Sequence, residues 1–201
     1  MSKFFWISLW IPCLLVGIPL SASAQPSLEP SSSRQMTEAE WQTITSLWKT
    51  DPPLLEPILE QSFAVNLQGY GSIFFLSLFD SSSPGQPQTL THWLVDGGRV
   101  RWELPMSEEL TPLSYTPFSL DAVVFTELDF DGLTDIYTIA SYITGIGATG
   151  AIPFPVVTLY QQQEDGSFLI LQEVSLALTE RGVATVAEAE EILRKEMLFL
   201  P

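Results

Sequence analysis

The chain has 201 residues, 24 of them acidic and 8 basic, and its formal net charge at pH 7 is −16. A charge of this sign repels the phosphates of nucleic acids, so we expect no nucleic-acid partner. The single cysteine, Cys13, excludes an intramolecular disulfide and a cysteine-based metal site.

Residues 1–24 have the pattern of an export signal. An apolar run at 4–20 follows Lys3, and the small residues at 22–24 are typical of a cleavage site. Two prolines interrupt the run, which is also short for a bilayer span. We therefore expect a periplasmic or extracellular protein with no membrane span after cleavage. An uncleaved anchor helix is the alternative that the sequence leaves open.

Residues 25–36, QPSLEPSSSRQM, are rich in serine and proline and predict a flexible spacer before a single globular domain at 37–201. Thr37 and Glu40 have the spacing of a capping box and predict a helix that ends before the prolines at 52 and 53. One face of this helix carries four apolar residues, Trp41, Ile44, Leu47 and Trp48.

The hydrophobic period changes to that of strands from Phe63 onward. Two strands are predicted around the glycines at 69 and 71, and a hairpin is predicted to turn at 96–98, Asp-Gly-Gly. The run 73–79 is apolar on both faces apart from Ser77, which predicts a central strand covered on both sides.

The second half of the chain repeats this plan. Strands are predicted in LDAVVFTEL (120–128) and DIYTIASYI (135–143), followed by a hairpin over 154–174 that turns at Asp165-Gly166. Thr185 and Glu188 then predict the start of a last helix. Its apolar stripe, which we expect to dock on the sheet, consists of Val186, Ala189, Ile192, Leu193 and Met197.

The predicted fold class is α+β. We expect an antiparallel β meander of about eight strands, with an N-terminal and a C-terminal helix packed on the sheet. The shared plan suggests two four-stranded, blade-like units, 63–104 and 120–174, related by a divergent internal duplication; a simple meander explains the same pattern. The chain is too short for a full propeller beside two helices.

Gly145, Gly147 and Gly150 have the G-x-G-x-x-G spacing of dinucleotide-binding loops. That motif requires a helix that begins at the third glycine, and the prolines at 153 and 155 forbid one. We therefore expect no dinucleotide here, and predict a long glycine-hinged loop between two strands.

A second loop concentrates carboxylates. Glu127, Asp129, Asp131 and Asp135 occupy positions 1, 3, 5 and 9, with a glycine at position 6, in ELDFDGLTD. A carbonyl from Leu133 at position 7 would complete an oxygen cage suited to a hard cation. The sequence therefore predicts a structural Ca²⁺ site; an acidic turn without an ion is the alternative. An EF-hand fits less well, because position 12 is a threonine and the flanks are strands.

This pattern resembles the calcium-loop repeats of the FG-GAP and VCBS type found in integrin-like β-propellers. The resemblance covers residues 120–171 and rests on the loop 127–136 and on the later Asp-Gly-Ser-Phe turn at 165–168. It implies that Ca²⁺ props the loop between two strands and that the unit contacts proteins or glycans. The chain departs from the family pattern in a glutamate at position 1, a phenylalanine at position 4 and a single copy of the motif.

His92 is the only histidine, and the chain has no G-x-S-x-G motif. We predict no catalytic residues and expect a non-catalytic, calcium-stabilised module of the cell envelope that binds another macromolecule or supports an assembly. The alternative is a carboxylate-dependent hydrolase of envelope polysaccharide, which would need two carboxylates on opposite sides of a sugar.

Overall fold

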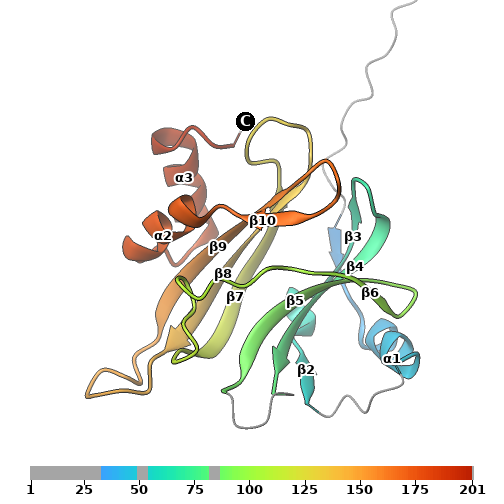
Figure 1. Ribbon diagram of the computed structural model, residues 1–201, viewed down its shortest axis with the longest axis horizontal. Coiled ribbons are helices and arrows are strands. Elements are labelled where there is room, and N and C mark those ends of the chain that lie inside the picture. Colours follow the sequence, from blue (N-terminus) through green and yellow to red (C-terminus); the bar gives the residue numbers. More distant parts are fainter. Residues whose placement is uncertain (1–32, 49–53, 82–86, 201) are drawn as a thin grey trace, which may run out of the picture.

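The computed structural model of the protein describes residues 33–48, 54–81 and 87–200. The described residues form an α+β fold with ten strands in two antiparallel sheets and three α-helices (Figure 1). The predicted signal and most of the predicted spacer lie outside these residues. No helix within the described ranges has the length and apolar character needed to cross a membrane.

The first sheet has six strands, and four of them follow one another in chain order. These four are β3 (Phe63–Leu67), β4 (Gly71–Asp80), β5 (Thr89–Asp96) and β6 (Arg99–Glu103). β1 (Ser33–Gln35) pairs with the outer edge of β3, and β2 (Leu55–Pro57) pairs with the far end of β4, followed by a 3-10 turn, η1 (Leu59–Gln61). The predicted central strand is confirmed, because β4 pairs with β3 on one side and β5 on the other.

The second sheet contains the four remaining strands, again in chain order. They are β7 (Thr116–Thr126), β8 (Asp135–Ile143), β9 (Phe154–Gln162) and β10 (Phe168–Ile170). The two predicted four-stranded units are therefore present as two meanders, β3–β6 and β7–β10. Each meander has its predicted Asp-Gly turn between its last two strands, where glycines at positive φ make the tight bend possible.

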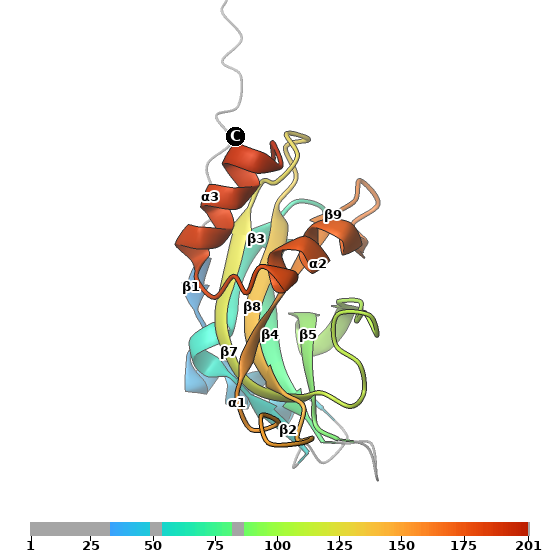
Figure 2. The same ribbon diagram turned by 90° about the vertical axis from the view of Figure 1, so that its left-hand side faces the viewer.

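The sheets pack face to face between two layers of helix (Figures 1 and 2). Residues of both sheets share two apolar clusters, one around Phe75 and Ile136 and the other around Leu90 and Val156. On the outer face of the first sheet, Leu76 and Leu78 pack against α1 (Glu38–Ser46). On the outer face of the second sheet lie α2 (Gln172–Glu180) and α3 (Val186–Glu196). Successive residues of a strand point to opposite faces of its sheet. Each sheet therefore contributes to the core between the sheets and to the core beneath its helices.

The predicted helix starts are confirmed at both ends of the fold. Thr37 and Glu40 form a reciprocal capping box at α1, and the Thr185 side chain accepts the Glu188 N–H at α3. The stripe of α3 packs on the second sheet through its buried Ala189 and Leu193. In α1, the face is narrower than predicted, because the helix ends at Ser46 and Leu47 beyond it is exposed.

Several boundaries differ from the prediction: β7 is Thr116–Thr126 where 120–128 was predicted, and the short β2 was not predicted. Residues 33–36, assigned to the spacer, belong to the fold: β1 pairs with β3, and Met36 is buried beside α1. The last strand of the second hairpin ends at Ile170 instead of Val174, and α2 follows almost at once. A short, nearly continuous apolar run fits a strand and a buried helix segment equally well, so the pattern alone does not distinguish them. In the structure the contacts of α2 with β9 decide for the helix.

Candidate metal site in the acidic loop

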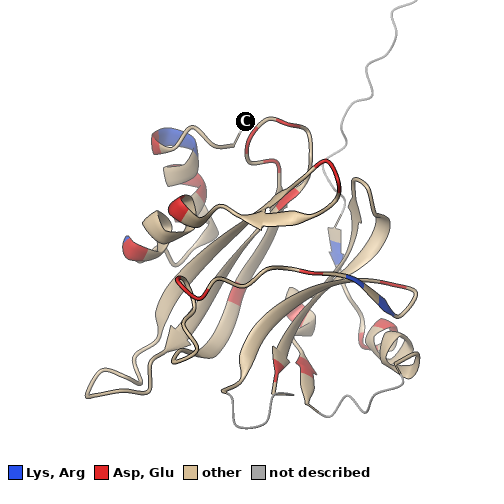
Figure 3. Cartoon of the chain, viewed as in Figure 1, with Lys and Arg blue, Asp and Glu red and all other residues tan. Residues whose placement is uncertain are grey.

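The acidic loop, residues 127–134, joins β7 to β8 at the end of the second sheet that lies beside the C-terminus (Figure 1). The Leu200 N–H donates to the carbonyl of Leu128 over 2.8 Å, and Leu128 is fully buried in the core beneath α3. The loop is therefore anchored at one point by the end of the chain. Acidic residues gather in this loop and in the nearby β9–β10 turn, and neither segment contains a lysine or arginine (Figure 3).

The backbone of the loop bends sharply twice. Phe130 at position 4 has φ 67° and Gly132 at position 6 has φ 81°, both in the left-handed region. Phe130 is unusual there, because a side chain of this size disfavours positive φ. Its ring is 62% exposed and does not cover the loop. Position 4 thus has the conformation that a glycine would adopt most easily.

Each of the four predicted carboxylate ligands accepts a hydrogen bond. Three of these bonds stay within the loop: Gly132 N–H to Glu127 over 2.7 Å, Asp131 N–H to Asp129 over 3.3 Å, and Leu133 N–H to Asp131 over 2.7 Å. Asp129 also accepts from the side-chain amide of Gln161 on β9. These bonds hold the acidic side chains close to the backbone of their own loop.

Asp135, the fourth carboxylate, differs from the other three in depth. It is fully buried, and its two oxygens accept the backbone N–H groups of Leu128 and Gln162 over 2.8 and 2.7 Å. Burial raises the pKa of Asp135 to about 7, although these two bonds lower it, and the charges of Asp129 and Asp131 raise it further. Asp135 therefore ties the acidic loop to the end of β9.

Asp131 is exposed at the tip of the loop. Partial burial raises the pKa of its carboxyl group, the Leu133 N–H lowers it, and the nearby charges of Asp129 and Glu127 raise it again. The carboxylates are thus close enough to repel one another. A cation between them would remove this repulsion.

The donor set fits a hard cation in its chemistry, because every predicted ligand supplies oxygen. A carboxylate that accepts one N–H retains further lone pairs for a cation. In the described conformation, however, no three acidic or histidine side chains of residues 33–48, 54–81 and 87–200 are grouped so that they could hold a metal ion. Binding through Glu127, Asp129 and Asp131 would therefore require their side chains to turn toward a common point.

Three glutamines that the sequence analysis did not single out surround this loop. The Gln68 side chain, in the turn between β3 and β4, donates to the carbonyl of Gly132 over 2.6 Å. The Gln162 side chain donates in turn to the carbonyl of Gln68 over 2.6 Å, which leaves its own amide oxygen buried without a partner among the described residues. Gln161 binds Asp129. Isolated glutamines carry no periodic signal, so only the packing of the two sheets brings them together.

The glycine loop lies at the opposite end of the second sheet, between β8 and β9 (Figure 1). The predicted long loop is confirmed: no helix follows Gly150, and β9 begins at Phe154. The Gly145 N–H donates to the carbonyl of Gly150 over 2.8 Å, which closes the loop on itself. A Cβ atom at Gly150 would lie 2.3 Å from the backbone nitrogen of Ile146, so the close approach explains this glycine without a phosphate.

His92 and Ser77 do not form a nucleophile–base pair. His92 Nδ1 lies 3.1 Å from Ser77 Oγ, and Ser77 Oγ lies 2.6 Å from the carbonyl oxygen of Gln61. Two oxygens at that separation require the serine proton between them. The histidine is therefore the donor to the serine, the reverse of the arrangement that activates a serine.

Comparisons with protein-family models, with curated proteins and with solved structures found no match.

Proposed function

We propose that the protein is an exported, non-catalytic binding or structural module of the cell envelope, and that Ca²⁺ stabilises its acidic loop. The predicted partner is a protein or a glycan. The signal-like residues 1–24 support the location. The observation that carries the calcium proposal is the backbone of the loop.

The left-handed conformations at positions 4 and 6 support the resemblance to FG-GAP and VCBS loops, in which position 4 is commonly glycine. A phenylalanine at φ 67° is strained by roughly 1 kcal/mol or more, and such strain needs a compensating interaction. The ring supplies little of it, because it is exposed. We infer that the bend serves to direct the carboxylates of Glu127, Asp129 and Asp131 toward one ion, with the carbonyl of Leu133 beside them.

Asp135, the fourth predicted carboxylate ligand, has a different part in this proposal, because both of its oxygens already accept hydrogen bonds from backbone N–H groups. Its two bonds to backbone N–H groups fix the end of the loop. A cation beside Asp129 and Asp131 would also reduce the repulsion that raises its pKa. The ion would thus stabilise the charged form of a buried carboxylate, and through it the junction of β8 with β9.

The test is thermal unfolding of the purified protein in chelator and in 1 mM CaCl₂. For a site with a Kd of about 10⁻⁴ M, saturation at 1 mM adds about 1.4 kcal/mol to the free energy of unfolding. For a domain of this size, the midpoint should rise by roughly 3–6 °C. An unchanged midpoint would remove the ion from this account.

A matched pair of variants separates the ion from the turn. Asp131→Ala removes a predicted ligand together with the bond to the Leu133 N–H, and Asp165→Ala removes the same kind of bond, to the Ser167 N–H over 2.9 Å, in the β9–β10 turn. Both aspartates are exposed. We expect Asp131→Ala to abolish the calcium-dependent shift and Asp165→Ala to keep it. Equal loss in both variants would point to a general effect of calcium on an acidic protein.

The hydrolase alternative gains no support from the space between the sheets. The cavity there has one acidic residue in its lining, Glu108. Glycoside hydrolysis needs two carboxyl groups across the scissile bond.

A further inference from the structure

The interior between the two sheets contains a row of polar side chains. Ser77 on β4 pairs in register with His92 on β5, and Thr138 on β8 pairs in register with Thr158 on β9. All four are buried, with His92 only 4% exposed. The residues two positions before and after them on these strands belong to the apolar clusters, so the row lies between the two apolar clusters that the sheets share.

The hydrogen bonds of Ser77 determine which ring nitrogen of His92 carries the proton. Because Ser77 gives its only proton to the carbonyl of Gln61, the imidazole must carry its proton on Nδ1 and donate it to Ser77 Oγ. The other ring nitrogen, Nε2, is then a bare acceptor. It accepts no hydrogen bond from the described residues. Burial lowers the pKa of His92 to about 3, which agrees with a neutral ring.

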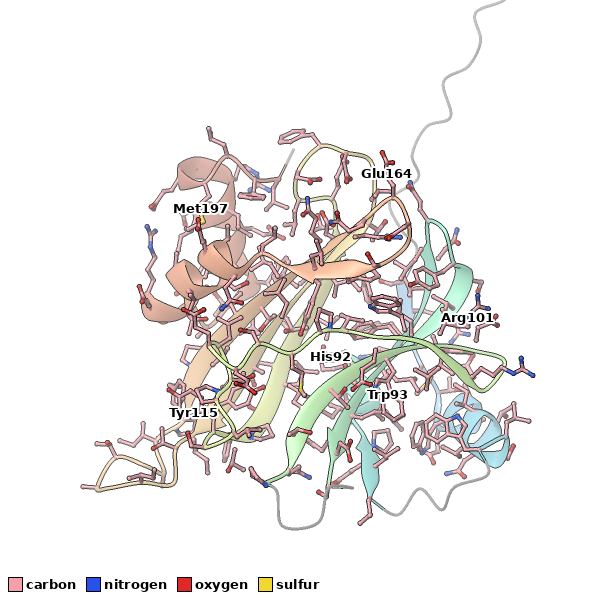
Figure 4. The ribbon with its side chains drawn as sticks, viewed as in Figure 1. His92, Trp93, Arg101, Tyr115, Glu164 and Met197 are labelled. Atoms are coloured by element: carbon pink, nitrogen blue, oxygen red, sulfur yellow. The ribbon has the colours of Figure 1, made fainter. Side chains whose placement is uncertain are left out.

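His92 belongs to the wall of a cavity. The inner part of this cavity, about 20 Å³, is lined by His92 and by the hydroxyl-bearing residues Thr138, Thr158 and Tyr160. An outer part of about 100 Å³ shares Leu90 and Tyr142 with it and extends under the segment that joins β6 to β7. Figure 4 shows His92 between the two sheets and Tyr115, from the outer wall, nearer the periphery.

The size and charge of this space limit what it can hold. About 10–15 Å³ is room for one water-sized group, and an apolar cavity of about 150 Å³ binds benzene in another protein. The inner part thus suits one polar group, and the outer part suits a single ring or a short chain. No lysine or arginine lines either part, and the one acidic residue, Glu108, belongs to the outer part. A charged ligand would lose its hydration without a counter-charge.

Nε2 of His92 has no hydrogen bond to the described residues, and it is not among their fully buried side-chain atoms without a partner, so it is accessible from the cavity. Its lone pair is free to accept a hydrogen bond from a group in that space. The row therefore suits recognition of a group that completes its hydrogen bonds.

We propose that the space between the sheets binds a small uncharged molecule, with one ring or a short apolar chain and one O–H group that donates to Nε2 of His92. The apolar part lies in the outer cavity against Leu90, Tyr115 and Tyr142. The hydroxyls of Thr138 and Thr158, which also interact with the hydroxyl of Tyr160, line the same inner part. This site is independent of the acidic loop, and its test needs no calcium.

The experiment compares phenol with toluene, which have the same shape and differ in the donor. Binding is followed by amide chemical shifts in the full protein with EDTA present. Toluene is the more apolar of the two and would be preferred by an apolar cavity. We expect phenol to bind at least tenfold more tightly and to shift the amides of β5, β8 and β9. Tighter or equal binding of toluene, or no binding of phenol at 10 mM, would overturn the proposal.

A variant pair assigns the preference to Nε2. His92→Leu removes the acceptor, and Ser62→Ala removes a bond to the Ser77 N–H in the same buried network without touching the cavity. We expect the phenol preference to fall below twofold in His92→Leu and to persist in Ser62→Ala. If His92→Leu does not fold, a crystal of the wild type soaked in phenol decides. A phenol oxygen within 3.2 Å of Nε2 supports the proposal, and ordered water alone in the inner cavity overturns it.

Discussion

The two meanders of this protein have the same strand order and differ most in their first connection. In the first meander, β3 and β4 are joined by three residues, 68–70, and the turn closes itself with a bond from the Tyr70 N–H to the carbonyl of Leu67 over 3.1 Å. In the second, β7 and β8 are joined by the eight residues of the acidic loop. The two connections touch, because the Gln68 side chain donates to the carbonyl of Gly132.

The difference shows what a longer turn requires. Backbone N–H groups that leave the ladder must find another acceptor, and a short turn finds it in its own carbonyl. The acidic loop uses side-chain carboxylates instead, at Gly132, Asp131, Leu133 and Leu128. The second strand begins with Gly71 in one meander and with the buried Asp135 in the other. The carboxylates therefore have a structural task with or without an ion.

The largest expected effect is the loss of Asp135. Asp135→Ala leaves two buried N–H groups, of Leu128 and Gln162, without an acceptor, and we expect it to lower the free energy of unfolding by about 2–5 kcal/mol. The matched control is Asp121→Ala on the same sheet. Asp121 also accepts two bonds, from Ser119 and Ser141 over 2.7 Å each, but it is exposed. The control should cost less than about 1 kcal/mol. Equal losses in denaturant titrations would show that burial of Asp135 is not the cause.

The second-largest expected effect is the pH dependence of stability that comes from His92, the buried base of the first meander. The pKa of His92 in the folded protein is about 3, below the value of about 6.5 expected for the unfolded chain. Between these values the unfolded state binds more protons, so this contribution to stability is complete above pH 6.5 and is lost as the pH falls. From pH 7 to pH 4 the loss is about 3 kcal/mol.

His92→Gln isolates this contribution, because all other groups titrate in both proteins. We expect the stability of the wild type to fall more steeply than that of the variant between pH 6.5 and pH 4, as measured by urea unfolding. Parallel pH profiles would mean that the imidazole can be protonated within the folded protein.

The smallest effect is at a bond that joins the two meanders directly. The Tyr70 hydroxyl, in the turn of the first meander, donates to the carbonyl of Gly166 in the second over 2.7 Å. We expect Tyr70→Phe to lower the melting midpoint by an amount equivalent to about 0.5–1.5 kcal/mol. Tyr115→Phe is the control, because its hydroxyl makes no hydrogen bond with the described residues. A larger loss in the control would show that the Tyr70 bond contributes little to the junction.

Much of the fold could be predicted because its signals are local. The change of period at Phe63, the Asp-Gly turns and the helix caps at Thr37 and Thr185 each depend on a few neighbouring residues, and each is confirmed. The acidic loop was located in the same way. Its positive φ at position 4 was not, because nothing in Phe130 favours that conformation. The helix α2 was missed where a strand and a helix share the same short apolar pattern.

The sequence by itself determined the eight strands of the two meanders, their Asp-Gly turns, the starts of α1 and α3 and the concentration of carboxylates in one loop, because backbone preferences and side-chain periodicity act over a few residues. Only the tertiary structure decided which strands face each other, which amides bind the acidic loop, and that Ser77, His92, Thr138 and Thr158 form one polar row. The alternation of apolar and polar residues predicts that a side chain points inward, but it does not predict which side chains it contacts there. That partner is set by the packing of two sheets whose strands are far apart in the chain.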